Sequence, residues 1–245
     1  MKRVRLDQLL VTRGLSESRS KARAAIEAGG VTVDGQPARS ASQQVERDAD
    51  IVAVEAHRFV GRGALKLDHA LTLWPVLVEG RVVLDVGAST GGFTEVCLER
   101  GAVKVFAVDV GSGQMHERVA ADPRVVNLEK TDARSLDTDL IPETPELIVC
   151  DASFIGLAKV LPTALDLAEE GADLIALIKP QFEGSGPSSV GKKGVIKDPD
   201  VQAAAVTGVR DWLESIEWTV NATTESPITG ADGNIEFLLW ATKRV

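Results

Sequence analysis

Four charged side chains in this sequence could act together on a weakly acidic group: Lys66, Asp151, Lys179 and Glu236. A lysine that lies near a second cation has a lowered pKa, so that a fraction of it is neutral and can remove a proton. We expect Lys179 to be a base that takes a proton from a hydroxyl group, with Lys66 lowering its pKa and holding the substrate. Asp151 would position Lys179, and Glu236 would orient Lys66 or the ribose of a substrate. Two ordinary ion pairs are the alternative interpretation.

These residues can converge only if the elements that carry them meet at one edge of a sheet. Asp151 and Lys179 each close an apolar stretch, Glu236 opens another, and Lys66 lies on a helical segment ahead of the first stretch. Near-continuous apolar stretches that alternate with helix-length segments are typical of a parallel sheet covered on both faces. The sequence therefore predicts an α/β, Rossmann-like domain, whose ligands lie beyond the carboxyl ends of the parallel strands. The predicted strands are 82–86, 103–109, 125–128, 147–151 and 174–179, followed by an antiparallel pair at 219–222 and 236–240.

A glycine-rich segment follows the first predicted strand and opens a helix. Its glycines permit a tight turn and a close approach of the backbone to a ligand. The segment lacks the third glycine of a dinucleotide fingerprint, which favours S-adenosylmethionine (SAM) over a nicotinamide cofactor. A role in packing alone is the third alternative. The predicted cofactor-binding residues are Asp85, Gly87, Ala88, Ser89, Thr90, Gly91, Gly92, Phe93, Asp109 and Asp132.

Three acids of this set have separate expected roles. Asp85 precedes the glycine-rich segment and would meet the amino-acid end of SAM. Asp109 ends the second predicted strand, where a carboxylate can accept hydrogen bonds from both ribose hydroxyls. Asp132 follows the third predicted strand and would contact the adenine amino group.

Charge is distributed unevenly along the 245 residues, whose formal net charge is −9. Between Met1 and Ala24, seven Lys or Arg residues oppose two acids, whereas from Arg58 onward 18 bases oppose 28 acids. A basic head on an acidic body is typical of one-sided docking to nucleic acid, although a solvated helix face is the plainer alternative. The residues predicted to bind RNA are Arg5, Arg13, Arg19, Lys21 and Arg23.

The basic head has the pattern of a small α+β domain. Leucines at helical spacing precede Gly14, a second helical segment ends at Gly29, and a strand at 31–33 runs into the turn Asp34-Gly35. The second, α/β domain begins within a few residues of the end of this pattern. The predicted organisation is an RNA-binding domain at 1–56, a linker at 57–60 and the Rossmann-like domain at 61–245.

Other classes of protein fit the sequence poorly. No apolar run approaches the ~20 residues that span a bilayer, and no apolar segment of a secretory signal follows the N-terminal charges. Cys97 and Cys150 make no disulfide framework, and the three histidines have no partner at metal-ligand spacing. We therefore expect a cytoplasmic protein without a metal or a membrane partner. The Gly/Ser/Lys-rich segment Gly184–Lys193 is expected to be a mobile loop.

The head also carries a family pattern, in Arg5-Leu6-Asp7, Leu9-Leu10, Arg13-Gly14-Leu15 and Ser18-Arg19, with Gly30-Val31, Val33 and Gly35 behind them. On these residues the first 56 positions resemble the alpha-L RNA-binding domain, which occurs in a small-subunit ribosomal protein and in several RNA-modifying enzymes. The resemblance implies that Arg and Lys side chains on helices recognise structured RNA.

A further resemblance rests on four motifs of the second domain, Gly61–Leu67, Gly87–Thr94, Cys150–Ile155 and Lys179–Glu183. The domain is similar to the FtsJ-type ribose 2′-O-methyltransferases, whose Lys-Asp-Lys-Glu tetrad falls in order on Lys66, Asp151, Lys179 and Glu236. The whole chain resembles the TlyA family, in which an alpha-L domain precedes this methyltransferase. The family implies SAM-dependent 2′-O-methylation of a cytidine in ribosomal RNA of the large subunit, and in some members of the small subunit as well.

Two functions of other classes stay open. Members of the TlyA family are often called haemolysins, but the sequence has no amphipathic stretch of the membrane-surface type. An RNA-binding protein that has lost catalysis is the other alternative, against which the complete tetrad and glycine-rich segment argue. Other methyl acceptors fit less well, because amino-group methylation usually needs prolines where the sequence has Asp151-Ala152-Ser153-Phe154. Carbon-5 methylation needs a nucleophilic cysteine, and Cys150 is expected to be buried.

Overall fold

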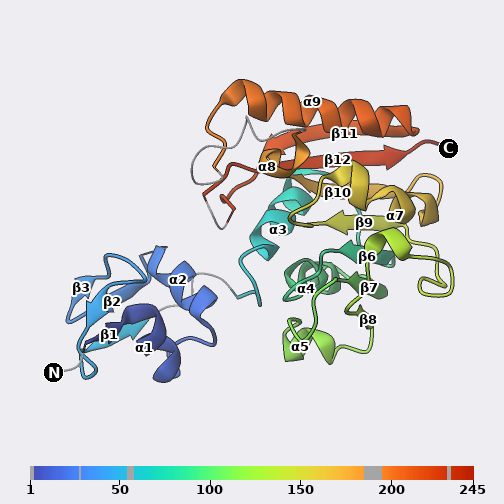
Figure 1. The fold of residues 1–245 in the computed structure, drawn as a ribbon. Coiled ribbons are helices and arrows are strands. Elements are labelled where there is room, and N and C mark those ends of the chain that lie inside the picture. Colours follow the sequence, from blue (N-terminus) through green and yellow to red (C-terminus); the bar gives the residue numbers. More distant parts are fainter. Residues whose placement is uncertain (1–2, 28, 54–57, 185–194, 231–232) are drawn as a thin grey trace. The chain divides into compact units, whose positions relative to one another are not determined.

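We describe residues 3–27, 29–53, 58–184, 195–230 and 233–245 of a computed structural model (Figure 1). The chain divides into two compact units, Met1–Arg62 and Gly63–Val245. The division lies close to the predicted linker at 57–60, although residues 54–57 are outside the described ranges. No helix within those ranges is both long and apolar enough to cross a membrane.

The N-terminal unit packs two helices against short antiparallel strands. The helices are α1 (Leu6–Thr12) and α2 (Arg19–Glu27), and their leucines and alanines fill a small core with the strand valines. Asp34 and Gly35 have φ values of 50° and 74°, as a two-residue hairpin turn requires. β2 pairs with β3 and β5, and β1 pairs with β4. These strands are β1 (Val4–Arg5), β2 (Val31–Val33), β3 (Gln36–Pro37), β4 (Gln44–Val45) and β5 (Ile51–Ala53).

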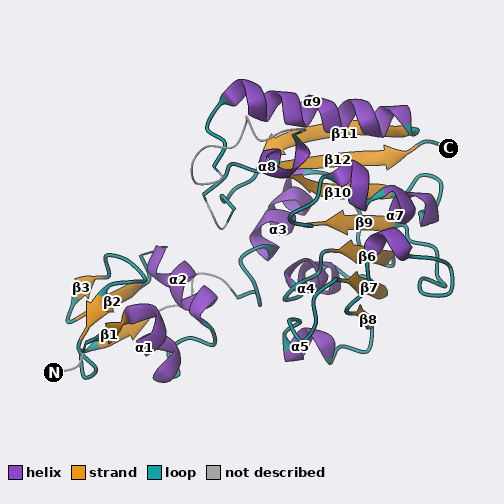
Figure 2. Ribbon diagram, viewed as in Figure 1, coloured by secondary structure: helices purple, strands orange, loops and turns teal. Residues whose placement is uncertain are grey.

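The second unit is built on a seven-stranded sheet with the order β11-β12-β10-β9-β6-β7-β8 (Figure 2). The five strands from β10 to β8 are parallel to their neighbours, whereas β12 is antiparallel to β10 and β11 is antiparallel to β12. The central strands are apolar on both faces, which is why helices must cover both. The strands are β6 (Val82–Val86), β7 (Lys104–Val108), β8 (Val125–Leu128), β9 (Leu147–Cys150), β10 (Asp173–Ile178), β11 (Trp218–Glu225) and β12 (Phe237–Lys243).

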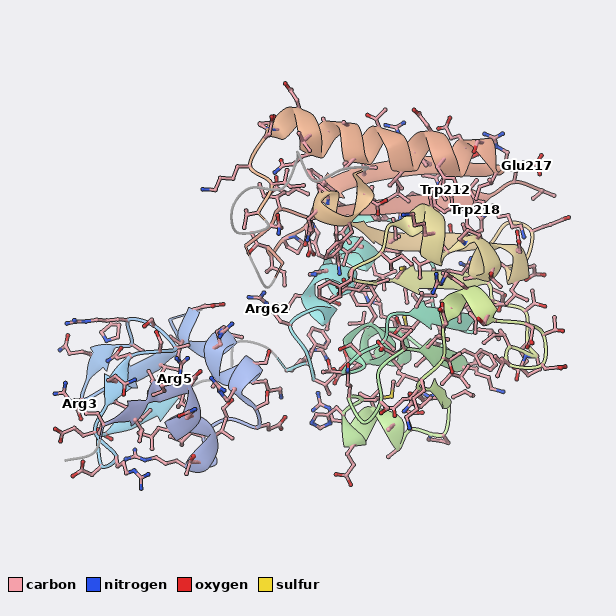
Figure 3. All side chains as sticks on the ribbon, in the orientation of Figure 1. Arg3, Arg5, Arg62, Trp212, Glu217 and Trp218 are labelled. Atoms are coloured by element: carbon pink, nitrogen blue, oxygen red, sulfur yellow. The ribbon has the colours of Figure 1, made fainter. Side chains whose placement is uncertain are left out.

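Helices on the two faces bury alternate side chains of the strands. α3 packs against α4, while α6 contacts α7 and α9. The larger core lies between the sheet and α6, α7 and α9, and includes Trp218, which is 1% exposed and is labelled in Figure 3. The helices are α3 (Ala64–Leu73), α4 (Gly92–Glu99), α5 (Glu117–Ala120), the 3-10 helix η1 (Ala133–Ser135), α6 (Leu157–Val160), α7 (Pro162–Leu167), α8 (Pro180–Glu183) and α9 (Pro199–Ser215).

The predicted fold class is confirmed, and every predicted strand is present. Strand ends differ from the prediction by one to three residues, as is usual where a chain leaves a ladder. Asp109, Asp151 and Lys179 lie directly after β7, β9 and β10, and Glu236 lies directly before β12, instead of inside the strands. Their backbones are already turning out of the sheet, which lets their side chains gather at its edge. The segment expected to be a mobile loop lies, apart from Gly184, outside the described residues.

One carboxylate lies inside the sheet. Asp85 of β6 is 0% exposed, and its Oδ2 accepts a hydrogen bond of 2.6 Å from Thr94 Oγ1 on α4. Its Oδ1 has no hydrogen-bond partner among the described residues. Burial raises the pKa of Asp85 to about 7, and the hydrogen bond from Thr94 opposes this shift. The unfolded chain, in contrast, exposes this carboxyl to water.

Replacement of this carboxylate predicts a pH-dependent gain in stability. Because the pKa of Asp85 is higher in the folded state, its neutral form stabilises the fold at low pH, and this stability is lost as pH rises toward 7. Asp85→Asn keeps an acceptor for Thr94 and cannot ionise. We expect the melting temperature of the variant to exceed that of the parent protein by more at pH 8 than at pH 5. An equal increase in melting temperature at both pH values would contradict the raised pKa of Asp85 in the folded state.

Candidate active site

The strand order places a site at the carboxyl ends of β6 and β9. From β6 the chain proceeds to β7 and β8 on one side, and from β9 to β10 on the other. At such a switch point the loops that follow neighbouring strands separate and leave a crevice, where ligands of open α/β sheets bind. The glycine-rich segment follows β6, and Asp151 follows β9.

The structure brings the four predicted catalytic residues together. Lys66 Nζ, from the first turn of α3, lies 2.6 Å from Glu236 Oε2 and 3.6 Å from Asp151 Oδ2. Lys179 Nζ lies 2.7 Å from Asp151 Oδ1. The charges therefore alternate in the order Glu236, Lys66, Asp151, Lys179. Both lysines and Glu236 are buried, and Asp151 is partly exposed.

Lys179 has three oxygen atoms close to its ammonium group. It donates hydrogen bonds to Ser153 Oγ at 2.7 Å and to the backbone oxygen of Asp151 at 3.1 Å. Its contact with Asp151 Oδ1 is an ion pair without the alignment of a hydrogen bond. Of the three oxygen atoms, only the Ser153 hydroxyl belongs to an exposed residue. A substrate hydroxyl can therefore reach Lys179 from the side of Ser153.

Two glycines give the carboxylates of this cluster their room. A Cβ at Gly230 would lie 2.4 Å from Glu236 Oε1, and one at Gly63 would lie 3.2 Å from Asp151 Oδ2. Neither glycine has a positive φ, so their backbones would accept a side chain. Glycine is therefore needed at these two positions to leave space for the carboxylates, and not for its backbone freedom.

A cavity of about 520 Å³ opens beside Asp151 at the ends of β6, β7 and β9. Its volume is within the range of sites that bind small molecules. Of the residues predicted to bind a cofactor, four line it: Gly87, Ser89, Asp109 and Asp132.

The remaining predicted cofactor residues, among them Ala88 and Thr90, are not in its lining. Gly91 and Gly92 begin α4; a Cβ at Gly91 would meet Val119 at 3.0 Å, and Phe93 is buried at 4% exposure. These residues shape the turn and pack it against the protein. Asp85, buried beneath the turn, is not in the lining either.

Two acids of the cavity already have partners. Asp109 Oδ2 accepts from Ser89 N at 2.8 Å and Oδ1 from Gly111 N at 2.7 Å, so it joins the glycine-rich turn to the loop after β7. Asp132 pairs with Arg134 at 2.6 Å, and the Arg134 side chain lowers the pKa of this carboxyl to about 2. A carboxylate oxygen has a second lone pair, so each acid can still accept from a ligand.

Sequence reasoning missed several residues of this cavity, including Phe154, whose side chain is 89% exposed and whose φ is 67°. An aromatic residue directly after a predicted catalytic segment was the available signal. Other residues of the lining that it missed include Val110, Gly111, Gln114, Arg134, Ser153 and Ile155.

Three arginines of the basic head have partners within the N-terminal unit. Arg5, labelled in Figure 3, and Arg19 both contact the buried Asp7 at 2.9 Å, and together, Arg5 foremost, they hold the pKa of the Asp7 carboxyl well below its usual range. Arg13 donates to the backbone oxygens of Arg47 and Ala49.

The other two predicted RNA-binding residues also differ from each other. Lys21 is 7% exposed and pairs with Glu17. Arg23 is exposed on α2, four residues after Arg19, whose side chain keeps 55% of its exposure. Because residues four apart share one helix face, Arg19 and Arg23 point outward together.

No cluster of three or more His, Cys, Asp or Glu side chains in the described part of the chain could hold a metal ion. Cys97 and Cys150 are both free and buried, and burial raises the pKa of Cys150 to about 12. A thiol in that state is a poor nucleophile.

The contact at Gly230 predicts a loss of activity without a loss of fold. Gly230→Ala must move the Glu236 carboxylate and so disturb Lys66. Misplacement by about 1 Å can lower a rate by ~100-fold, so we expect kcat to fall by up to that factor. Gly208→Ala is the matched control, since a Cβ there meets nothing within 4 Å in α9. Equal activity of the two variants would show that the position of Glu236 is not critical.

The chain was compared with known proteins. The FtsJ-like methyltransferase family matches residues 59–243, and the S4 domain matches residues 4–51. The 16S/23S rRNA (cytidine-2′-O)-methyltransferase TlyA of Mycobacterium tuberculosis is 45% identical over 98% of this chain and 90% of that protein. Hemolysin A of Brachyspira hyodysenteriae is 36% identical over 96% of this chain and 98% of its own length.

Solved structures agree with these matches. A protein of Streptococcus thermophilus, described as a candidate hemolysin, has a TM-score of 0.79 and 33% identity, covering 100% of this chain and 90% of that one. Together the matches span both units. The chain therefore belongs to the FtsJ-like methyltransferase family and to its TlyA group, in which an S4 domain precedes the methyltransferase domain.

Proposed function

We propose that this protein is a SAM-dependent methyltransferase that methylates the ribose 2′-hydroxyl of a cytidine in ribosomal RNA, on the large subunit. The observation that carries the proposal is the chain of four alternating charges from Glu236 to Lys179, three of them buried and Asp151 partly exposed, beside a cavity at the switch point of the sheet. The S4 domain and the activity in the name of the Mycobacterium tuberculosis relative support RNA as the substrate.

The residues of the cavity fit SAM. Asp109 offers two carboxylate oxygens to a ribose, and Asp132 offers an acceptor to the adenine amino group. Asp85 lies beneath the turn and outside the lining, so it supports the turn and is not among the residues that would contact SAM. When bound, SAM supplies an electrophilic methyl group. Gly87 and Ser89 place the backbone of the turn at the wall of the cavity.

The tetrad prepares the hydroxyl that accepts the methyl group. A ribose hydroxyl is a weak acid, so a base and a fixed orientation are both needed. Lys179 Nζ is the group that takes this proton, and Asp151 holds Lys179 in place at 2.7 Å. Lys66, held by Glu236 at 2.6 Å, fixes the second oxygen of Asp151 and keeps a positive charge beside the reacting hydroxyl.

Exposed side chains in each of the two units suit RNA. Phe154 presents an aromatic face at the rim of the cavity, on which an unstacked base can stack. Arg19 and Arg23 present two guanidinium groups on one face of α2 for phosphate contacts. Arg19 also pairs with the buried Asp7 and so has a structural role besides, whereas Arg5, Arg13 and Lys21 have partners inside the N-terminal unit and are better assigned to its stability.

The function is tested by methyl transfer from labelled SAM to purified large and small ribosomal subunits from cells that lack the protein. We expect label on a cytidine 2′-oxygen of the large subunit. Label on the small subunit would show that this subunit is a second substrate. Lysis of erythrocytes by the same preparation, without transfer, would favour a haemolysin, the name that the Brachyspira hyodysenteriae relative carries. SAM binding without transfer to either subunit would favour an RNA-binding protein.

Lys179→Ala is expected to abolish methyl transfer and to leave SAM affinity nearly unchanged. The reason is that Lys179 contacts Asp151 and Ser153 and does not line the cavity. Single-turnover transfer and calorimetric titration with SAM measure the two effects separately. Methyl transfer by the variant at the rate of the parent protein would show that Lys179 is not the base.

Arg23→Glu is expected to weaken binding to ribosomal subunits and to lower the slope of log affinity against log salt by about one unit. The reason is that Arg23 is exposed on the same face of α2 as Arg19. Arg39→Glu is the matched control, because it makes the same change at an exposed position outside α2. If both variants bind alike, the head acts through its overall charge and not through this helix face.

A further inference from the structure

The segment Lys179–Glu183 contains four residues with no place in the tetrad, Pro180, Gln181, Phe182 and Glu183. Lys179 is the residue before α8, and Glu183 is the last residue of that one-turn helix. The segment lies against the loop after β9, which runs from Asp151 to Gly156 and leads into α6. The two segments follow neighbouring parallel strands.

Glu183 supplies a cap that α6 lacks. Gly156, the residue before α6, has no side chain to accept from the free N–H groups of the first turn. The amide of Leu157, the first residue of α6, donates instead to Glu183 Oε1 at 3.0 Å. The cap is therefore built from an element 26 residues away in the sequence. Any shift of Glu183 would release the start of α6.

Gly156 shows how closely the two segments approach. A Cβ at this position would lie 3.0 Å from Glu183 Oε2 and 3.1 Å from the backbone oxygen of Phe182. Gly156 has an extended backbone with φ of −75° that any residue can adopt. The glycine is therefore required by the contact with Glu183 and Phe182.

Between these anchors lies the turn Ser153-Phe154, which lines the cavity. At one end, Ser153 Oγ is 2.7 Å from Lys179 Nζ. At the other end, Leu157 is held by Glu183. Phe154, between them, has a left-handed backbone and is 89% exposed, and its ring lies 5.3 Å from that of Phe182. Such a strained and exposed residue keeps one orientation only if its surroundings fix it.

We propose that Glu183 is a positioning residue for the RNA substrate, which fixes the Ser153-Phe154 turn by capping α6 from α8. The proposal rests on the proposed function, because it assigns the turn to the nucleotide that is methylated. Glu183 itself touches neither the tetrad nor the substrate. It acts through Leu157 and Gly156, so its loss should affect the recognition of RNA before it affects the chemistry.

The test compares Glu183→Ala, Glu183→Gln, Phe154→Ala and the double variant Glu183→Ala/Phe154→Ala in the full chain. Steady-state kcat and KM for large ribosomal subunits are measured at saturating SAM. We expect Glu183→Ala to raise KM by about tenfold, the scale of one lost hydrogen bond, with a smaller change in kcat. Glu183→Gln keeps an acceptor for Leu157 and should restore KM to within about threefold of the parent value.

The double variant separates positioning from general destabilisation. If Glu183 acts by placing Phe154, its removal adds little once Phe154 is already alanine. An equal loss in both backgrounds, an unchanged KM in Glu183→Ala, or a Gln variant as impaired as the Ala variant would each overturn the proposal. Should Glu183→Ala fail to fold, Gly156→Ala disturbs the same contact from the other side and should raise KM likewise. A parent protein that transfers no methyl group would instead contradict the proposed function.

Discussion

The second unit is organised around two ammonium groups and two carboxylates that have to stay together. An unpaired charge in a protein interior costs several kcal/mol, and removal of one partner from a buried pair typically costs about 3–5 kcal/mol. Lys66 and Glu236 are 170 residues apart in the sequence and 2.6 Å apart in space. Their pairing therefore constrains the chain from α3 to β12. Asp151 then couples this pair to Lys179, so that no member can move alone.

This constraint explains the closing antiparallel strands. A parallel sheet from β8 to β10 is enough to place Asp151 and Lys179 at one edge. β12 enters in the opposite direction, so the residue that precedes it lies at that same edge. Glu236 occupies this position, beside α3. The reversal of strand direction is thus what brings a fourth charged group to the cluster.

Glycine has three separate uses around the site. Gly87 has a φ of 85°, and a Cβ there would lie 2.9 Å from the backbone of Ala152, so both conformation and space require it. Gly63 and Gly230 give room to carboxylates, and Gly156 gives room to the contact between two loops. A glycine motif in a sequence does not distinguish between these uses. An arginine-rich sequence is ambiguous in the same way, because in the N-terminal unit Arg5 pairs with the buried Asp7 whereas Arg23 is exposed.

The sequence by itself determined the fold class and the place of each strand within a few residues, and it singled out four charged residues that the structure brings together. It could do so because apolar periodicity and strand-end position are local properties, and because Lys, Asp and Glu at such ends have few structural uses. Only the tertiary structure decided which predicted side chains line the cavity. In the structure Phe93 and Gly91 have packing roles, Arg13 donates to backbone carbonyls, Phe154 lines the cavity, and Glu183 caps the helix that follows the Phe154 turn. Those outcomes depend on contacts between segments far apart in the chain, and no local pattern encodes the distance between two loops.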